Sequence, residues 1–220
     1  MADKRPVVAL IHAVASGARI ANDAFAEAFP EAVLWNLLDD RLLDDALAAG
    51  GLDGPLRRRM LRLIEHAVQG GAEGVLLTCS SYGSVADTAR RLWDRPVHKS
   101  DEAMFRRALA QHPGRLVVAA STAPAVPAAV EQLRALAAES GAPGPRITTA
   151  LCAEAAQADS PEQAAALLAH ALRDTPADAV LLAQYSLTPA AGPLENRLGV
   201  PVLSGARAAA LALRDELLAP

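Results

Sequence analysis

The chain has 220 residues and a formal net charge of -4 at pH 7, with 52% hydrophobic and 21% charged residues. Its length suits one large domain or two small lobes with a real core and excludes a disordered chain, and no apolar run of membrane-spanning length is free of charge or proline. Only Lys4 and Lys99 among the 21 basic residues are lysine, and the arginines form no basic stripe, so neither a membrane nor a nucleic-acid partner is expected.

Cysteine usage and the first residues favour a reducing, cytoplasmic setting. Cys79 and Cys152 are too few for a disulfide framework, and residues 1–6 lack the apolar stretch of a signal peptide. The sequence contains no C-x-x-C, H-E-x-x-H, G-x-G-x-x-G or G-x-x-x-x-G-K-[ST] motif. We therefore expect no metal and no cofactor, and chemistry that uses side chains alone.

Strand-like and helix-like segments alternate along the chain. Short apolar runs of strand length cover residues 7–11, 33–36, 75–78, 97–98, 116–120, 147–150, 180–183 and 200–203. Amphipathic or Ala-rich stretches of helical length cover residues 56–68, 84–92, 128–138, 161–172 and 205–218. Continuous apolar strands with helical crossovers predict the α/β class, with doubly wound parallel sheets that are covered on both faces.

The two halves of the chain are similar to each other. When the sequence is shifted by 105 positions, residues 72–77 align with 177–182, and Pro96-Val97 aligns with Pro201-Val202. Chance similarity between buried strands is the alternative, but the equal spacing favours duplication. We expect two pseudo-symmetric lobes, one of residues 1–98 joined by the C-terminal helix 204–220 and one of residues 99–203, with an active-site cleft between them.

The segment Thr78-Cys79-Ser80-Ser81-Tyr82-Gly83 joins a predicted strand to a predicted helix. Cys79 thus lies before a helix N-terminus, where unpaired N–H groups and the helix dipole favour an anion and lower the pKa of a thiol. Ser80, Ser81 and neighbouring N–H groups are candidates to hold a substrate carboxylate, with Tyr82 as a further donor. A small buried cysteine followed by helix-capping serines is the structural alternative.

The corresponding segment of the second half begins Ala183-Gln184-Tyr185-Ser186, and Gln184 aligns with Cys79. A glutamine donates and accepts hydrogen bonds, but it cannot take a proton from carbon at neutral pH. Gln184, Tyr185 and Ser186 are therefore candidates for substrate binding. In a purely structural reading, Ser186 or Thr188 caps the next helix.

Two further residues lie at the ends of predicted strands. His12 ends the first strand and is a candidate acid, base or hydrogen-bond donor, with a hydrogen-bonded structural histidine as the alternative. Cys152 follows another strand, where it either replaces the missing partner of Cys79 or is a small apolar residue. Asp39, Asp40, Asp44 and Asp45 are interleaved with leucine as at a helix start, and they lack the spacing of a cation-binding loop.

These segments together resemble the aspartate/glutamate racemase superfamily, which is cofactor-independent and includes amino-acid and hydantoin racemases, maleate isomerases and arylmalonate decarboxylases. The similarity covers most of the chain. The order in which these segments follow one another is more specific than any one of them. It rests on residues 10–13, 36–43, 78–83, 101–104 and 181–184.

The resemblance implies two pseudo-symmetric α/β lobes that, in racemases, each offer one cysteine to opposite faces of the substrate. Cys79 is similar in position to the first of these cysteines, and Ser80 and Ser81 to neighbours that hold the substrate carboxylate. Thr122 resembles a threonine that the family places near the site. Gln184 departs from the pattern, because it stands where the second cysteine is expected.

This departure leaves three functions open. The first is an isomerase or racemase-like enzyme in which Cys79 transfers a proton at the carbon next to a carboxylate or carbonyl of a small acid. The second is a single-cysteine decarboxylase of a substituted malonate, although the single cysteine of such enzymes lies in the second half. The third is an inactive carboxylate-binding protein. Substrate identity is open, as is assembly into a homo-oligomer.

Overall fold

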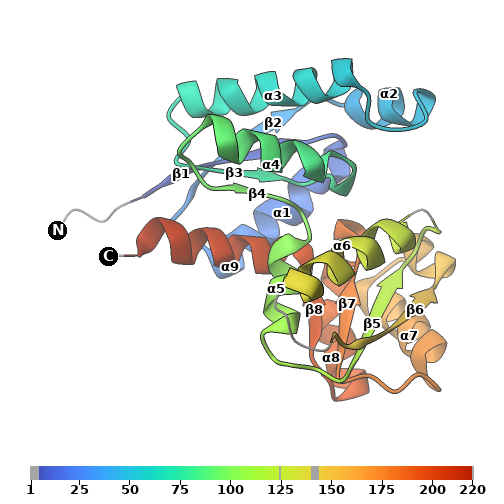
Figure 1. Cartoon of the computed structure of the whole chain (residues 1–220). Helices are drawn as coiled ribbons and strands as arrows, with labels where there is room; N and C mark the ends of the chain where they lie inside the picture. Colours follow the sequence, from blue (N-terminus) through green and yellow to red (C-terminus); the bar gives the residue numbers. More distant parts are fainter. Residues whose placement is uncertain (1–4, 124, 140–143, 220) are drawn as a thin grey trace. The chain divides into compact units, whose positions relative to one another are not determined.

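The computed structural model describes residues 5–123, 125–139 and 144–219, in which strands and helices alternate (Figure 1). The chain divides into two compact units. The first unit comprises residues up to Ser100 together with residues from Ala209 onward, and the second comprises Asp101–Ala208. Among the described residues, none of the helices has both the length and the hydropathy needed to span a bilayer.

The first unit is built on a four-stranded parallel sheet with strand order β2-β1-β3-β4. Its strands are β1 (Val7–His12), β2 (Val33–Leu38), β3 (Gly74–Leu77) and β4 (Val97–His98). Its helices are α1 (Ala15–Ala28), α2 (Leu42–Ala48), α3 (Gly54–Gln69), the short 3-10 helix η1 (Ser80–Tyr82), α4 (Gly83–Leu92) and most of α9 (Gly205–Leu218).

The second unit repeats this plan with strand order β6-β5-β7-β8, again all parallel. Its strands are β5 (Arg115–Ala120), β6 (Arg146–Leu151), β7 (Ala179–Leu182) and β8 (Val202–Ser204). Its helices are α5 (Glu102–Leu109), α6 (Ala125–Glu139), η2 (Ala153–Gln157), α7 (Pro161–Leu172), η3 (Tyr185–Ala190) and α8 (Ala191–Leu198). The predicted α/β class with two pseudo-symmetric lobes is confirmed.

All eight predicted strands exist, and each lies within a few residues of its expected position. Four of the α-helices in the described residues have no counterpart among the predicted stretches: α1, α2, α5 and α8. Helix α8 is short and ends at Gly199, whose left-handed φ of 67° suits glycine. It has only eight residues, and Gly192 and Pro193 lie in its first turn, so its helical signal in the sequence is weak.

Each sheet is covered on both faces, as the apolar strands require. In β1, Ala9 and Ile11 pack in a cluster with residues of α3 and α4, whereas the alternate residues Val8 and Leu10 are buried on the other side. Figure 1 shows α3 and α4 on one face of this sheet and α1 and α9 on the opposite face. The sheet is therefore the middle layer of the unit.

Gly70 is the position where an added methyl group should cost most at a helix end. Its φ of -77° suits any residue, but a Cβ there would lie 2.6 Å from Cζ3 of Trp35 and closer still to Cη2. Gly70→Ala is therefore expected to lower the free energy of unfolding by about 1–3 kcal/mol through overpacking, as measured by urea unfolding. The control is Gly192→Ala in α8, where a Cβ meets nothing within 4 Å and helix propensity predicts no loss. Equal losses in the two variants would contradict this interpretation.

Candidate active site

Cys79 lies two residues beyond the end of β3, at the carboxyl edge of the first sheet. The N–H of Thr78 still donates to the carbonyl of Ile11 at 3.1 Å, and Cys79 then turns the chain into η1 with an extended backbone, φ -110° and ψ 117°. Its side chain is half-buried against the core, while Ser80 and Ser81 are exposed. The thiol thus lies directly before η1, and α4 follows η1 from Gly83.

Tyr82 is part of the core of the first unit. It is fully buried, and its hydroxyl donates a 2.8 Å hydrogen bond to the carbonyl of Leu42 at the start of α2. Burial raises the pKa of Tyr82, and the negative charge of Cys79 adds to this effect. The hydroxyl was predicted to donate to a ligand, whereas the structure uses it within the fold, so we leave Tyr82 out of the binding set.

His12 is the centre of a polar network at the same sheet edge. Its Nδ1 lies 2.9 Å from the Thr78 hydroxyl, which is also 3.2 Å from the carbonyl oxygen of Ile11. Its Nε2 lies 2.8 Å from Oδ1 of Asn36, whose amide donates to Asn22 of α1 at 3.1 Å. The ring is fully buried, and both nitrogens are hydrogen-bonded, so it matches the structural histidine considered above.

Burial lowers the pKa of His12, although the hydrogen bond to Asn36 acts in the opposite direction. The unfolded chain therefore binds a proton more readily, and stability should fall as the pH drops below the unfolded pKa of about 6.5. The slope from one such group is at most about 1.4 kcal/mol per pH unit. We expect His12→Gln to remove this component from urea unfolding measured between pH 5 and pH 8. The exposed His170→Gln should keep it, and an unchanged slope in His12→Gln would contradict the assignment.

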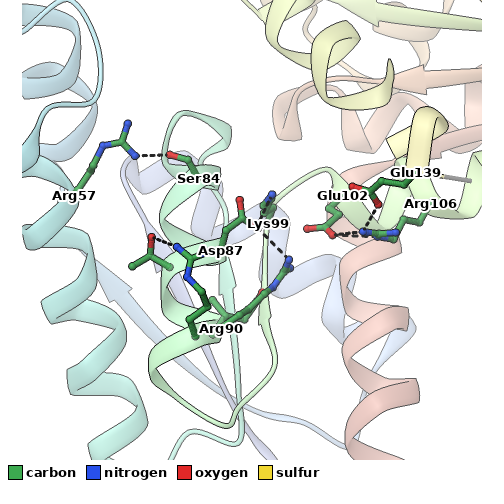
Figure 2. Close-up of polar contacts among 11 residues, drawn as sticks. Arg57, Ser84, Asp87, Arg90, Lys99, Glu102, Arg106 and Glu139 are labelled. Carbon is green, nitrogen blue, oxygen red and sulfur yellow. Dashed lines mark hydrogen bonds and ion pairs between the residues drawn. The ribbon is translucent and has the colours of Figure 1, made fainter. Parts of the chain in front are cut away.

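Charged side chains fix the start of α4 and the loop after β4. Arg57 of α3 donates to the Ser84 hydroxyl at 2.9 Å, and the Lys99 ammonium pairs with Asp87 at 2.8 Å (Figure 2). The aliphatic part of Lys99 lies beside Gly83, where a Cβ would be 3.6 Å from Cδ. These contacts fix α4, the helix that follows the segment carrying Cys79, to α3 and to the residue after β4.

The acidic residues after β2 are held by arginine. Arg59 of α3 donates to Asp39 at 2.6 Å and to Asp45 at 2.7 Å, and Arg41 also pairs with Asp45. Within the part of the chain that the structure describes, no group of three or more His, Cys, Asp or Glu side chains is arranged to hold a metal ion. Asp39 and Asp45 are thus both bound by arginine side chains next to α2.

Gln184 lies at the position of the second unit that corresponds to Cys79. The N–H of Ala183 donates to Ala119 at 2.9 Å, as that of Thr78 does to Ile11, so Gln184 follows β7 as Cys79 follows β3. Its Oε1 accepts hydrogen bonds from the N–H of Ser121 at 2.6 Å, from the Ser121 hydroxyl at 2.9 Å and from the N–H of Thr122 at 3.1 Å. Thr122, which the family resemblance places near the ligand, thus donates its backbone N–H to the side chain of Gln184.

The residues after Gln184 differ in exposure. Tyr185 is buried, and burial raises the pKa of its hydroxyl well above the ordinary value, with the charge of Asp101 adding to this. Ser186 is exposed. Neither Ser186 nor Thr188 caps the next helix as the structural reading expected, because η3 runs to Ala190 and α8 follows it directly.

Cys152 is buried at the start of η2, and its sulfur lies 3.9 Å from Oε2 of Glu154. Burial raises the pKa of this thiol, and the charge of Glu154 acts in the same direction. A protonated, buried thiol suits the reading of Cys152 as a small packed residue.

Sequence reasoning missed four residues of these networks: Asn22, Asn36, Thr78 and Ser121. Thr78 and Ser121 stand directly beside predicted strand ends, which was the available signal. Asn36 interrupts the apolar pattern of β2. It lies opposite Leu10 in the parallel pairing of β1 with β2, and this brings its side chain within reach of His12, two residues further along β1. Asn22 lies in a helix that was not predicted and could not have been found this way.

Parallel sheets with polar residues at their carboxyl edges form the α/β architecture in which ligands bind at the ends of the strands, as expected from the sequence. A model of the Asp/Glu/hydantoin racemase family matches residues 9–213, so the chain belongs to this family. No curated protein matches the sequence.

Solved structures with the same fold include racemases and a decarboxylase. Allantoin racemase from Klebsiella pneumoniae is 20% identical, with a TM-score of 0.70 over 96% of this chain and 87% of that one. An arylmalonate decarboxylase is also 20% identical, with a TM-score of 0.65 over 95% of this chain and 92% of that one. Glutamate racemase from Thermus thermophilus is 19% identical, with a TM-score of 0.65 over 98% and 81%. At these identities the likeness establishes the fold.

Proposed function

We propose that the protein is a cofactor-independent enzyme that transfers a proton at the carbon next to a carboxylate or carbonyl group of a small acid. Cys79 is the proposed acid/base. The observation that carries this proposal is the position of Cys79, which is half-buried between the carboxyl end of β3 and the start of η1, next to two exposed serines. The family and the allantoin and glutamate racemases of the same fold support an isomerase or racemase-like reaction.

The proposed step is a proton transfer between carbon and sulfur. The Cys79 thiolate takes the proton from the carbon atom, the electron pair of the C–H bond moves into the adjacent carboxylate or carbonyl, and an enediolate and a neutral thiol result. Return of the proton restores the thiolate. The enediolate needs hydrogen-bond donors, for which Ser80, Ser81 and nearby N–H groups are the candidates, and one such donor contributes about 2.7–4 kcal/mol.

Gln184 favours a second candidate, decarboxylation of a substituted malonate. Racemisation by two bases needs a second titrating group, and Gln184 has none at neutral pH. Decarboxylation breaks a C–C bond, so carbon dioxide leaves and the electron pair forms the enediolate directly. A single protonation by the Cys79 thiol then completes the reaction. The arylmalonate decarboxylase of the same fold is in keeping with this candidate.

Deuterium incorporation from heavy water tests the proposal. Amino acids, hydantoins and substituted malonates are incubated with the enzyme, and deuterium at the carbon next to the carboxylate or carbonyl is measured by mass spectrometry. We expect incorporation into at least one class, and its loss in Cys79→Ala. Turnover that is equal in Cys79→Ala would refute the role of the cysteine. No turnover, with a ligand that raises the melting temperature, would instead indicate an inactive binding protein.

A further inference from the structure

The orientation of the Gln184 amide follows from its partners. Backbone N–H groups only donate, and two of them, from Ser121 and Thr122, face the same atom of the Gln184 side chain. That atom is therefore the oxygen and not the nitrogen, and the amide is not free to flip. The Ser121 hydroxyl adds a third donor at 2.9 Å. Gln184 is thus held at one end by three hydrogen bonds from the residues that follow the adjacent strand β5.

The other end of the amide has its two N–H donors available. Among the described residues, Nε2 of Gln184 makes no hydrogen bond, while its side chain is only half-buried. The side chain lies at the carboxyl edge of the second sheet, which is the edge where open α/β sheets bind ligands. A side chain with a fixed acceptor end and an available donor end is pre-organised, because little rotational freedom is lost when a ligand binds.

We propose that Gln184 is a fixed hydrogen-bond donor to an oxygen atom of the ligand, and that Ser121 and Thr122 hold it in place. The ligand group that it meets is a carboxylate or carbonyl oxygen, because an amide N–H requires an acceptor. This inference rests on the proposed function for the kind of ligand. The two corresponding positions then have different roles. Cys79 is the proposed acid/base of the first unit, whereas Gln184 takes no proton and its N–H groups stabilise negative charge on an oxygen atom of the ligand.

Two substitutions distinguish the contribution of the donating Nε2 group of Gln184 from that of its accepting Oε1 atom. Gln184→Glu keeps an acceptor for all three hydrogen bonds, which become charge-assisted, but it removes both N–H donors and adds a repelling charge. Gln184→Ala removes both ends. The melting temperature should stay the same or rise in Gln184→Glu and fall in Gln184→Ala, because only the second leaves the donors of Ser121 and Thr122 without their partner.

The probe is malonate, a small dicarboxylate without other functional groups, and its affinity is measured by calorimetry on the whole protein at pH 7. We expect both variants to bind malonate about tenfold more weakly or worse than the unaltered chain. Weak binding by Gln184→Glu despite an intact melting temperature is the result that a merely structural glutamine would not produce.

Three outcomes would overturn the donor role. The first is equal malonate affinity in all three proteins. The second is tighter binding by Gln184→Ala, which would mean that the ligand takes the place of Oε1 between Ser121 and Thr122. The third is no malonate binding by the unaltered chain. If malonate affinity depends on Gln184 but the protein incorporates no deuterium into any substrate, only the proposed reaction is refuted. Failure of the donor role and failure of the proposed reaction are therefore distinguishable.

Discussion

Replacing Cys79 by serine is expected to lower the turnover number by about 10²–10⁴-fold, which is the contribution of a positioned acid/base. Serine preserves the size and the polarity of the side chain, but its hydroxyl does not ionise in the range where a thiol does. The half-buried position before η1 should be maintained, because the extended backbone at this position, φ -110° and ψ 117°, suits serine as well as cysteine. The measurement is the initial rate with the substrate identified by deuterium incorporation, together with the melting temperature.

Cys152→Ser is the matched control for this prediction. Cys152 is buried, and its thiol is kept protonated by that burial, so we expect its replacement to leave the rate within a few-fold of the unaltered enzyme. The rate of alkylation by iodoacetamide at pH 7 should drop in Cys79→Ser and not in Cys152→Ser. The reverse pattern, with activity lost only in Cys152→Ser, would transfer the catalytic role to the other cysteine.

Tyr82→Ala is expected to lower the free energy of unfolding by about 3–5 kcal/mol, the range for large buried aromatic residues. Tyr82 is fully buried, so the substitution leaves a cavity in the first unit next to Cys79. Tyr82→Phe keeps the ring and removes only the hydroxyl with its hydrogen bond to the carbonyl of Leu42, at a cost of about 0.5–1.5 kcal/mol.

Urea unfolding and ligand binding together distinguish the two roles of this tyrosine. If the hydroxyl supports the fold, Tyr82→Phe lowers stability and leaves the malonate affinity unchanged at a temperature where the protein is folded. If it contacts the ligand, Tyr82→Phe keeps the stability and loses affinity, which would restore the role predicted from the sequence.

The fold was predictable because parallel β-strands that are buried on both faces have a strong sequence signal. The run Leu116 to Ala120 has no polar residue, and all of its side chains are buried in β5. The repeat at 105 positions was visible where β3 and β7 have equal distances to β4 and β8. The distances between the first two strands differ in the two halves, so the repeat could not be followed there without the structure.

The candidate site was predictable as a set of positions and less so as a set of contacts. Strand ends could be located, and they carry Cys79 and Gln184. The hydrogen bonds of Gln184 depend on Ser121 and Thr122, which are more than 60 positions away in the sequence and become neighbours only when β5 pairs with β7. Tyr82 and Tyr185, which follow these strand ends, are both buried, and the sequence does not show which side of the turn enters the core.

The path of α9 has a consequence for the order in which the chain can fold on the ribosome. Leu213 is fully buried and Leu217 nearly so, and a Cβ at Gly74 would lie 2.9 Å from Leu213 and 3.1 Å from Leu217, so the end of α9 packs directly on β3. These leucines belong to the first unit but follow the whole of the second unit in the sequence. The second unit is therefore translated before the helix that completes one face of the first sheet, so the unit that carries Cys79 cannot complete its core until the whole second unit has been synthesised.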